Sequence, residues 1–283
     1  MRIGFMSSAA PQWDLATLLR EGRAVGCSAL EPRVEWKHRH GLERGQEAAW
    51  SAARRQAADA GMVISAVALG ARLNRATPEE RRAVVDDIAA YAELAAAAGA
   101  SVMRVFGGPM AEGWTMERAR PLVAEGLAAA AERCAPFHVT PCLETHDAFW
   151  NPTDVAWCLE HAGHANLGAV WHAAHHVRHD ISVDDAFALL APWVRHVHVS
   201  EIPAARGGDQ RGVYPVPLGE GDGSARHQIE LLARHGFDGT FSLEWINNAT
   251  QPVDPLPVLQ QYGRVMTRWL AEIGEQTSAL TRQ

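Results

Sequence analysis

Short apolar runs alternate with longer amphipathic segments along the whole chain. The runs are rich in Val, Leu and Phe and have Gly or polar residues at their borders, which is the pattern of buried β-strands. The pattern predicts strands over residues 2–6, 29–32, 62–69, 101–106, 138–144, 167–172, 195–200 and 240–245.

The segments between these runs carry helix signals. Thr77 and Pro78 stand where a helix takes its N-cap and first residue, and Gly99 follows the same segment as a C-terminal cap. The pattern predicts helices over residues 14–25, 44–60, 78–98, 115–134, 153–161, 182–190, 224–235 and 253–273.

Strands that alternate with helices favour a parallel sheet. At 283 residues the chain has about the length of one (β/α)8 domain, so we predict an α/β fold with a single TIM barrel over residues 1–283. An open doubly wound sheet is the alternative, but it usually has a Gly-rich turn after its first strand, and GFMSSAAPQ is not one. The longest irregular stretch, residues 201–222, is expected to be a loop that faces a substrate.

Four acid or imidazole side chains stand at or near the ends of four successive predicted strands: Glu144, His172, His198 and Glu244. In a parallel barrel these ends meet at the C-terminal mouth, where such enzymes keep their sites. Side chains alternate along a strand, so the same parity turns Cys142, Val170, His196 and Ser242 inward below them. Two carboxylates and two neutral imidazoles suit a divalent ion such as Mn, Co, Zn, Fe or Ni.

Composition narrows the range of partners. The net charge is −7, whereas proteins that bind nucleic acid usually carry an excess of positive charge, so we expect no nucleic-acid partner. No apolar run approaches the length of a membrane span, and the first residues do not form a signal peptide, so we expect a cytoplasmic protein that binds no membrane. The four cysteines form no C-x-x-C pair, and we expect them to be buried free thiols.

Five segments together resemble the xylose-isomerase-like TIM barrels, the sugar phosphate isomerase/epimerase family. They are L-E-T-H (143–146), W-H-A-A-H (171–175), H-V-H-V-S-E (196–201), P-L-G-E-G-D (217–222) and F-S-L-E-W (241–245). The resemblance implies an isomerase or epimerase of a sugar, keto-sugar or sugar phosphate. Such an enzyme abstracts a proton next to a carbonyl and uses the metal to stabilise the enediolate. It also implies a small carbohydrate substrate and association as a homodimer or homotetramer.

The resemblance also implies one divalent ion held by Glu144, His172, His198 and Glu244. The family usually reads W-D-x-x-H, whereas His172 stands here in place of the aspartate. The loss of one negative charge favours Mn, Co or Zn over Mg. In this reading Glu144 and Glu244 share ligand and acid–base roles, and His175 donates a hydrogen bond to the substrate.

Other candidates for substrate contact lie in predicted loops: His146, Glu201, Arg206, Trp13 and Trp150. Glu31 ends the second predicted strand, where a structural ion pair and a functional role are both open.

Two other functions remain open, and a third is disfavoured by the sequence. A metal-dependent dehydratase of a keto-polyol, such as a keto-inositol, would use the same proton abstraction. A metal-dependent endonuclease of this fold would need further histidines after the third and fourth strands, and residues 66–74 and 105–110 contain none. A metal-free sugar-binding barrel is the alternative from another class.

Overall fold

The computed structural model describes residues 1–203, 216–247 and 252–280 of the chain. The strands in these segments are β1 (Arg2–Met6), β2 (Ala29–Glu31), β3 (Val63–Ile64), β4 (Val67–Arg72), β5 (Val102–Phe106), β6 (Thr140–Glu144), β7 (Gly168–His172), β8 (Val194–Val199) and β9 (Thr240–Leu243).

All of these strands pair in parallel in one sheet, in the order β3-β2-β1-β9-β8-β7-β6-β5-β4. The residues that follow β2 bring the two ends of the sheet together. The amide of Ala68 in β4 donates to the carbonyl of Pro32 at 2.9 Å, and the amide of Val34 donates to the carbonyl of Ala68 at 3.2 Å. The sheet is therefore a nearly closed barrel.

The third predicted strand, residues 62–69, is interrupted in the structure. Its first part, β3, pairs with β2, and its second part, β4, pairs with β5. The break falls at Ser65 and Ala66, where the amide of Ser65 still donates to the carbonyl of Leu30 at 3.0 Å. The prediction of an eight-position α/β barrel is confirmed, with one position occupied by two short strands.

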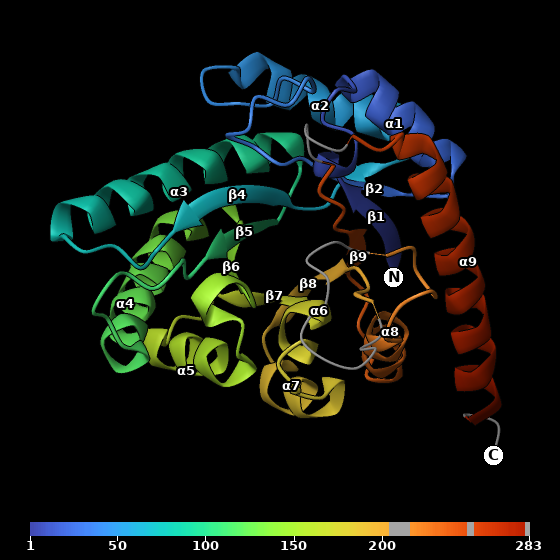
Figure 1. The fold of residues 1–283 in the computed structure, drawn as a ribbon. Coiled ribbons are helices and arrows are strands. Elements are labelled where there is room, and N and C mark those ends of the chain that lie inside the picture. The colour runs from blue at the N-terminus through green and yellow to red at the C-terminus, as the bar shows by residue number, and fades with distance from the viewer. Residues whose placement is uncertain (204–215, 248–251, 281–283) are drawn as a thin grey trace.

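The helices surround the strands as an outer ring (Figure 1). They are α1 (Leu15–Ala24), α2 (Glu47–Asp59), α3 (Pro78–Ala98), α4 (Met116–Cys134), α5 (Pro152–Ala162), α6 (Ala173–Val177), α7 (Val183–Leu190), α8 (Ser224–Arg234) and α9 (Pro255–Leu280), with short 3-10 turns at Ser7–Ala9, Ala135–Phe137 and Asp147–Phe149. Among the described residues, no helix is long and apolar enough to cross a membrane. The cytoplasmic location stays a prediction.

Local signals explain where helices begin and end. The side chain of Thr77 accepts a hydrogen bond from the amide of Glu80, and the carboxylate of Glu80 accepts one from the amide of Thr77, so α3 begins with a capping box. Gly99 ends α3 in the left-handed region, at φ 83°. The predicted helix at 78–98 is thus found with the same bounds.

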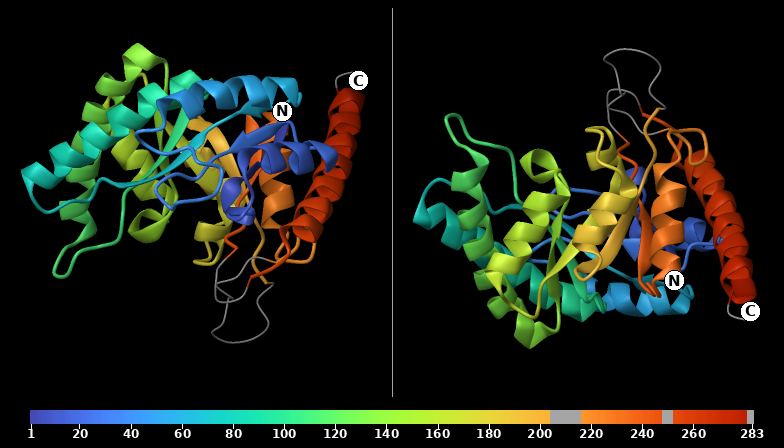
Figure 2. Two further views of the ribbon diagram at one scale, coloured as in Figure 1. Left: turned by 90° about the horizontal axis from the view of Figure 1, so that it is seen from above. Right: turned by 90° about the horizontal axis from the view of Figure 1, so that it is seen from below.

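The long C-terminal helix α9 runs along the outside of the barrel beside α8 in both views of Figure 2. Tyr262 on α9 is buried, and its hydroxyl donates to the carbonyl of Phe241 in β9 at 2.8 Å. Gly263 permits a close approach to the end of α1, since a Cβ at this position would lie 2.0 Å from the carbonyl oxygen of Val25. These contacts hold α9 over the strand that carries Glu244.

Candidate metal centre

The four side chains predicted at the strand ends lie together at the C-terminal mouth of the barrel. Nδ1 of His172 lies 2.8 Å from Oε2 of Glu244 and 3.6 Å from Oε1 of Glu144. Nδ1 of His198 lies 2.8 Å from Oε1 of Glu144 and 3.3 Å from Oε2 of Glu244. His175 joins them, with its ring centroid 4.3 Å from that of His172.

We call Glu144, His172, His175 and Glu244 the upper cluster. One ligand atom from each residue can be chosen so that all four atoms lie within 4.8 Å of one another. Three buried atoms of this cluster, Nδ1 of His172, Nε2 of His175 and Oε2 of Glu244, make no hydrogen bond of acceptable geometry, although Nδ1 of His172 and Oε2 of Glu244 face each other at 2.8 Å. Nitrogen and oxygen atoms that are close together, buried and unpartnered have the arrangement expected of ligands that face one cation. The residues therefore fit a divalent ion.

His172 is held in position from two sides. Its Nε2 lies 2.6 Å from Oγ of Ser200, so Nδ1 is the nitrogen that faces the two carboxylates. Its backbone amide donates to Oγ1 of Thr145 at 3.1 Å, and that hydroxyl donates to the carbonyl of His172 at 3.3 Å. Such supporting hydrogen bonds orient a ligating imidazole.

Glu144 is anchored by an arginine inside the barrel. Nη1 of Arg104, on β5, donates to Oε2 of Glu144 at 3.0 Å, and both side chains are buried. The guanidinium of Arg104 packs over the ring of Phe106 at 4.0 Å. Oε1 of Glu144 is left to face His198 and the centre, so Arg104 fixes which oxygen is offered.

A second group of side chains lies directly beneath the upper cluster. We call Glu31, His196, His198 and Ser242 the lower cluster. The carboxylate of Glu31 lies 2.9 Å from Nε2 of His196 and 3.1 Å from Nε2 of His198, and it accepts a hydrogen bond from the Ser242 hydroxyl at 2.6 Å. All four residues are buried. Because His198 contacts Glu31 with one nitrogen and Glu144 with the other, it connects the two clusters.

The charges of these groups are strongly coupled. Burial alone would raise the pKa of Glu144, but His198 and Arg104 outweigh it and hold that pKa well below its usual value. Burial would lower the pKa of His198, but Glu31 and Glu144 raise it well above its usual value. Burial also opposes ionisation of Glu244, but His198 and His172 keep its pKa well below the usual range. Both carboxylates are therefore ionised at neutral pH.

A cavity of about 370 Å³ opens above the upper cluster. His172, His175 and Glu244 line its floor, and His146, Trp150 and Arg178 line it as well. The volume falls within the range of pockets that bind small molecules. Since Glu144 is fully buried, Glu244 is the carboxylate that this cavity exposes to a ligand.

The other sequence candidates lie in different places. His146 lines the cavity between Phe106 and His175, with ring centroids at 4.6 and 4.5 Å, and Trp150 stacks on His179 at 3.8 Å. Trp13 packs against the core and does not line the cavity. Glu201 accepts hydrogen bonds from the amides of Gly219 and Gly221 at 2.7 and 3.1 Å, so its carboxylate holds the 216–222 segment and does not line the cavity. Arg206 and most of the predicted loop fall outside the described residues.

Sequence reasoning missed two arginines, and it left the role of Glu31 undecided. Arg104 had a usable signal, because a charged residue in the middle of a fully buried strand needs a partner. Arg178 follows His175 by three residues, about one helical turn, and so faces the same cavity. Glu31 was noted at the end of the second predicted strand, but its role could not be decided, since its partners come from β8 and β9, far along the chain.

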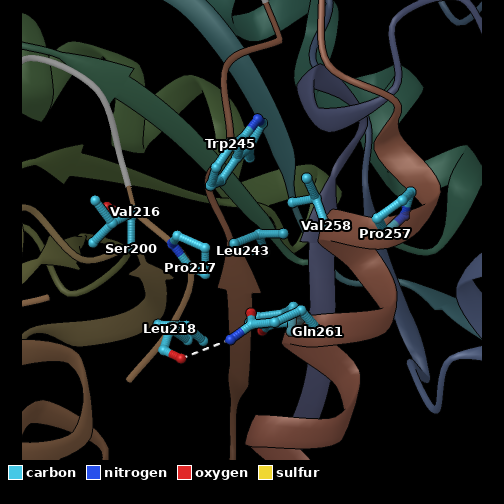
Figure 3. A pocket seen from close by; sticks show the side chains of 10 residues that line it. Ser200, Val216, Pro217, Leu218, Leu243, Trp245, Pro257, Val258 and Gln261 are labelled. Carbon is cyan, nitrogen blue, oxygen red and sulfur yellow. Dashed lines mark hydrogen bonds between the residues drawn. The ribbon is translucent and has the colours of Figure 1, made fainter. Parts of the chain in front are cut away.

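A smaller cavity of about 170 Å³ lies between β9 and α9, and Ser200 lines both it and the larger cavity (Figure 3). Leu243 and Trp245 line it, whereas Glu244 lies between them in sequence and turns to the barrel interior. The carbonyl of Leu218 accepts a hydrogen bond from Nε2 of Gln261 at 2.7 Å across one side of this cavity. Its mostly apolar walls offer little chemistry, and we assign it no role.

The fold agrees with comparisons to known proteins. Residues 19–266 match the family model described as xylose isomerase-like TIM barrel, and the chain belongs to this family. No curated protein matches the chain significantly in sequence.

Solved structures with the same fold include an L-ribulose 3-epimerase, with 16% identity, a TM-score of 0.80 and coverage of 99% of this chain and 97% of that one. A probable 3-DHS dehydratase from Bacillus anthracis has 19% identity and a TM-score of 0.75, with coverage of 94% and 99%. A D-psicose 3-epimerase from Clostridium cellulolyticum has 14% identity and a TM-score of 0.75, with coverage of 95% and 99%. At these identities the similarity establishes the fold.

Proposed function

We propose that the protein is a divalent-metal-dependent isomerase or epimerase of a small carbohydrate. The observation that carries this proposal is the upper cluster, in which unpartnered ligand atoms converge at the floor of a cavity of ligand size. The family match and the epimerases among proteins of the same fold support the same class.

Glu144, His172, His198 and Glu244 would hold the ion, with His175 at its edge. Two imidazoles and two carboxylates suit Mn, Co or Zn, whereas Mg prefers oxygen ligands. A bound divalent ion would act as a Lewis acid that polarises the substrate carbonyl. The protein residues then have to move a proton next to that carbonyl.

Glu244 is the group that would take this proton. It is ionised, it lines the cavity, and no arginine among the described residues is bonded to it, whereas Oε2 of Glu144 is held by Arg104. A carboxylate that must accept a proton needs a free oxygen within reach of the substrate. Glu144, fixed on both oxygens, would serve mainly to bind the ion and place it.

His175 would bind the oxygen on which negative charge develops. Burial and the neighbouring His172 hold the pKa of His175 well below its usual value, so its imidazole is neutral. Its Nε2 is unpartnered in the structure. A neutral imidazole with a free N–H can donate a hydrogen bond that strengthens as charge builds up.

Solvent exchange tests the reaction. The protein is loaded with Mn²⁺ in deuterated water and offered keto-sugars, aldo-sugars, polyols and their phosphates, and carbon-bound deuterium is read by NMR. We expect enzyme-dependent exchange into at least one compound. Absence of exchange from every compound that binds to the metal-loaded protein would refute proton transfer.

A dehydratase is the second candidate, because a protein of the same fold is a probable 3-DHS dehydratase. The same proton abstraction, followed by loss of a β-hydroxyl, gives an enone. Ultraviolet absorbance of the product therefore separates the two reactions, since an epimer does not absorb there. A metal-free sugar-binding barrel would show binding that survives chelation, and no exchange.

A further inference from the structure

The cavity above the upper cluster has one cationic side chain in its wall. Among the described residues that line it, Arg178 is the single arginine and there is no lysine. The two acidic side chains of the wall each lie beside another basic or imidazole group. Asp147 lies 2.9 Å from His146 and 3.7 Å from Arg72, and Glu244 faces His172. Arg178 therefore adds a positive charge to the wall, and among the described residues no carboxylate forms an ion pair with it.

The guanidinium of Arg178 is hydrogen-bonded to the protein through Nε, and its two terminal amino groups are available to a ligand. Its Nε donates to the carbonyl of Ala174 at 3.2 Å, which ties the guanidinium to α6. Within the part of the chain that the structure describes, its two terminal amino groups have no acceptor. These groups form the two-pronged edge of a guanidinium, whose parallel N–H bonds match the two oxygens of a carboxylate or phosphate.

The charge around the centre favours the same kind of ligand. Arg104 contacts Glu144 directly, and Arg33 is an electrostatic neighbour of Glu144, Glu244 and Arg104. Together with Glu31, the centre has three carboxylates, which Arg33, Arg104 and Arg178 balance. A divalent ion would then leave a positive excess, which an anionic ligand offsets at low cost.

We propose that the substrate carries an oxyanion group, a carboxylate or a phosphate, and that the terminal amino groups of Arg178 bind it. This proposal rests on the proposed function and adds the class of substrate. A sugar acid or sugar phosphate would place its reacting carbons at the upper cluster and its anionic end on Arg178. A single guanidinium fork, with no glycine-rich loop beside it, suits a carboxylate better than a phosphate dianion.

Three matched ligands test the proposal by direct binding, without turnover. D-Gluconate and D-glucitol have the same carbon chain and differ by a carboxylate in place of a hydroxymethyl group, and D-glucitol 6-phosphate adds a phosphate. Dissociation constants are measured by calorimetry on Mn²⁺-loaded protein, for the wild type, Arg178→Met, Arg178→Lys and the control Arg55→Met. Arg55 is exposed on α2.

We expect gluconate, glucitol 6-phosphate or both to bind at least about tenfold more tightly than glucitol, as charge-assisted hydrogen bonds allow. This preference should disappear in Arg178→Met, persist in part in Arg178→Lys and remain in Arg55→Met. Preference for gluconate alone assigns a carboxylate, and preference for the phosphate alone assigns a phosphate. Both results support the proposal.

Equal binding of all three ligands by the wild type would overturn it. So would an anion preference that survives in Arg178→Met, because the ion alone would then account for it. The proposed reaction can fail independently. If an anion preference depends on Arg178 but no compound exchanges deuterium, the anion site stands and the proton-transfer reaction does not.

Discussion

The upper and lower clusters contain similar kinds of side chain, but they differ in how many of their polar atoms have hydrogen-bond partners. In the lower cluster every oxygen of Glu31 accepts hydrogen bonds, from His196, His198 and Ser242, and the group is closed to solvent. In the upper cluster three buried ligand atoms have no hydrogen-bond partner and the group faces a cavity.

This difference separates a structural role from a functional one. A fully satisfied buried network rigidifies the strands that carry it. Buried polar atoms without partners cost stability, and they persist at sites that bind something. The lower cluster therefore holds His198 in place, and the upper cluster is where a metal and a substrate would bind.

Glu244→Gln should have the largest effect of any single change. It removes the proton acceptor in the upper cluster, and we expect a loss of about 10²- to 10⁴-fold in deuterium exchange. The control is Glu93→Gln, an exposed residue on α3, which should exchange at the wild-type rate. Full exchange by Glu244→Gln would show that the base lies elsewhere.

Whereas Glu244→Gln mainly lowers the rate of deuterium exchange, Glu31→Gln should mainly lower the stability of the fold. It removes the charge that pairs with two buried imidazoles, and breaking such a pair costs about 3–5 kcal/mol. Urea unfolding of the metal-free protein measures this loss in the free energy of unfolding. Glu244→Gln also removes ion pairs, with His172 and His198, but it should cost less, because Glu244 lines the cavity, where water can solvate the groups left behind. Equal losses in the two variants would remove the distinction between the clusters.

Metal binding should stabilise the folded protein through the upper cluster. An ion at about 100 times its dissociation constant adds about 2.7 kcal/mol to the free energy of unfolding. We expect Mn²⁺ or Zn²⁺ to raise the melting temperature of the wild type clearly more than that of Glu244→Gln. The same rise in both proteins would point to binding outside the upper cluster.

His172→Asp should change metal preference without abolishing the site. An aspartate restores the negative charge that the family usually has at this position, so selectivity should shift toward Mg²⁺ and Mn²⁺ and away from Zn²⁺. We expect a change of about tenfold, or ~1.4 kcal/mol, in relative affinity. Competition titrations with the three ions measure it, and an unchanged order of affinities would argue against His172 as a ligand.

The smallest effect concerns the four buried cysteines. Burial raises the pKa of Cys27, Cys134, Cys142 and Cys158 to about 12, so at pH 8 these thiols are protonated and unreactive. We expect a disulfide reagent to label none of them quickly in the native protein and all of them in denaturant. Rapid native labelling of Cys142, which lies two residues below Glu144, would show that the barrel interior opens.

Local patterns predicted the fold well because each strand and helix carries its own signal. The capping box at Thr77 and Glu80 fixes the start of α3 from neighbouring residues alone. The break between β3 and β4 was not predictable, because it depends on which neighbouring strand each half pairs with.

The candidate site was predictable to the extent that it depends on position along strands. Glu144 and Glu244 could be placed at the mouth from strand parity. The role of Glu31 could not be read, because it depends on pairing that brings residue 31 next to residues 196, 198 and 242. The anchoring of Glu201 by two backbone amides is likewise a product of the folded 216–222 segment.

The most direct test is a titration of metal-free protein with Mn²⁺, followed by electron paramagnetic resonance. We predict one tightly bound ion per chain in the wild type, binding weakened by at least about tenfold in Glu244→Gln and in His172→Ala, and near-normal binding in His196→Gln, which alters only the lower cluster. Binding that is absent from the wild type, or that is lost in His196→Gln but retained in both upper-cluster variants, would contradict the assignment.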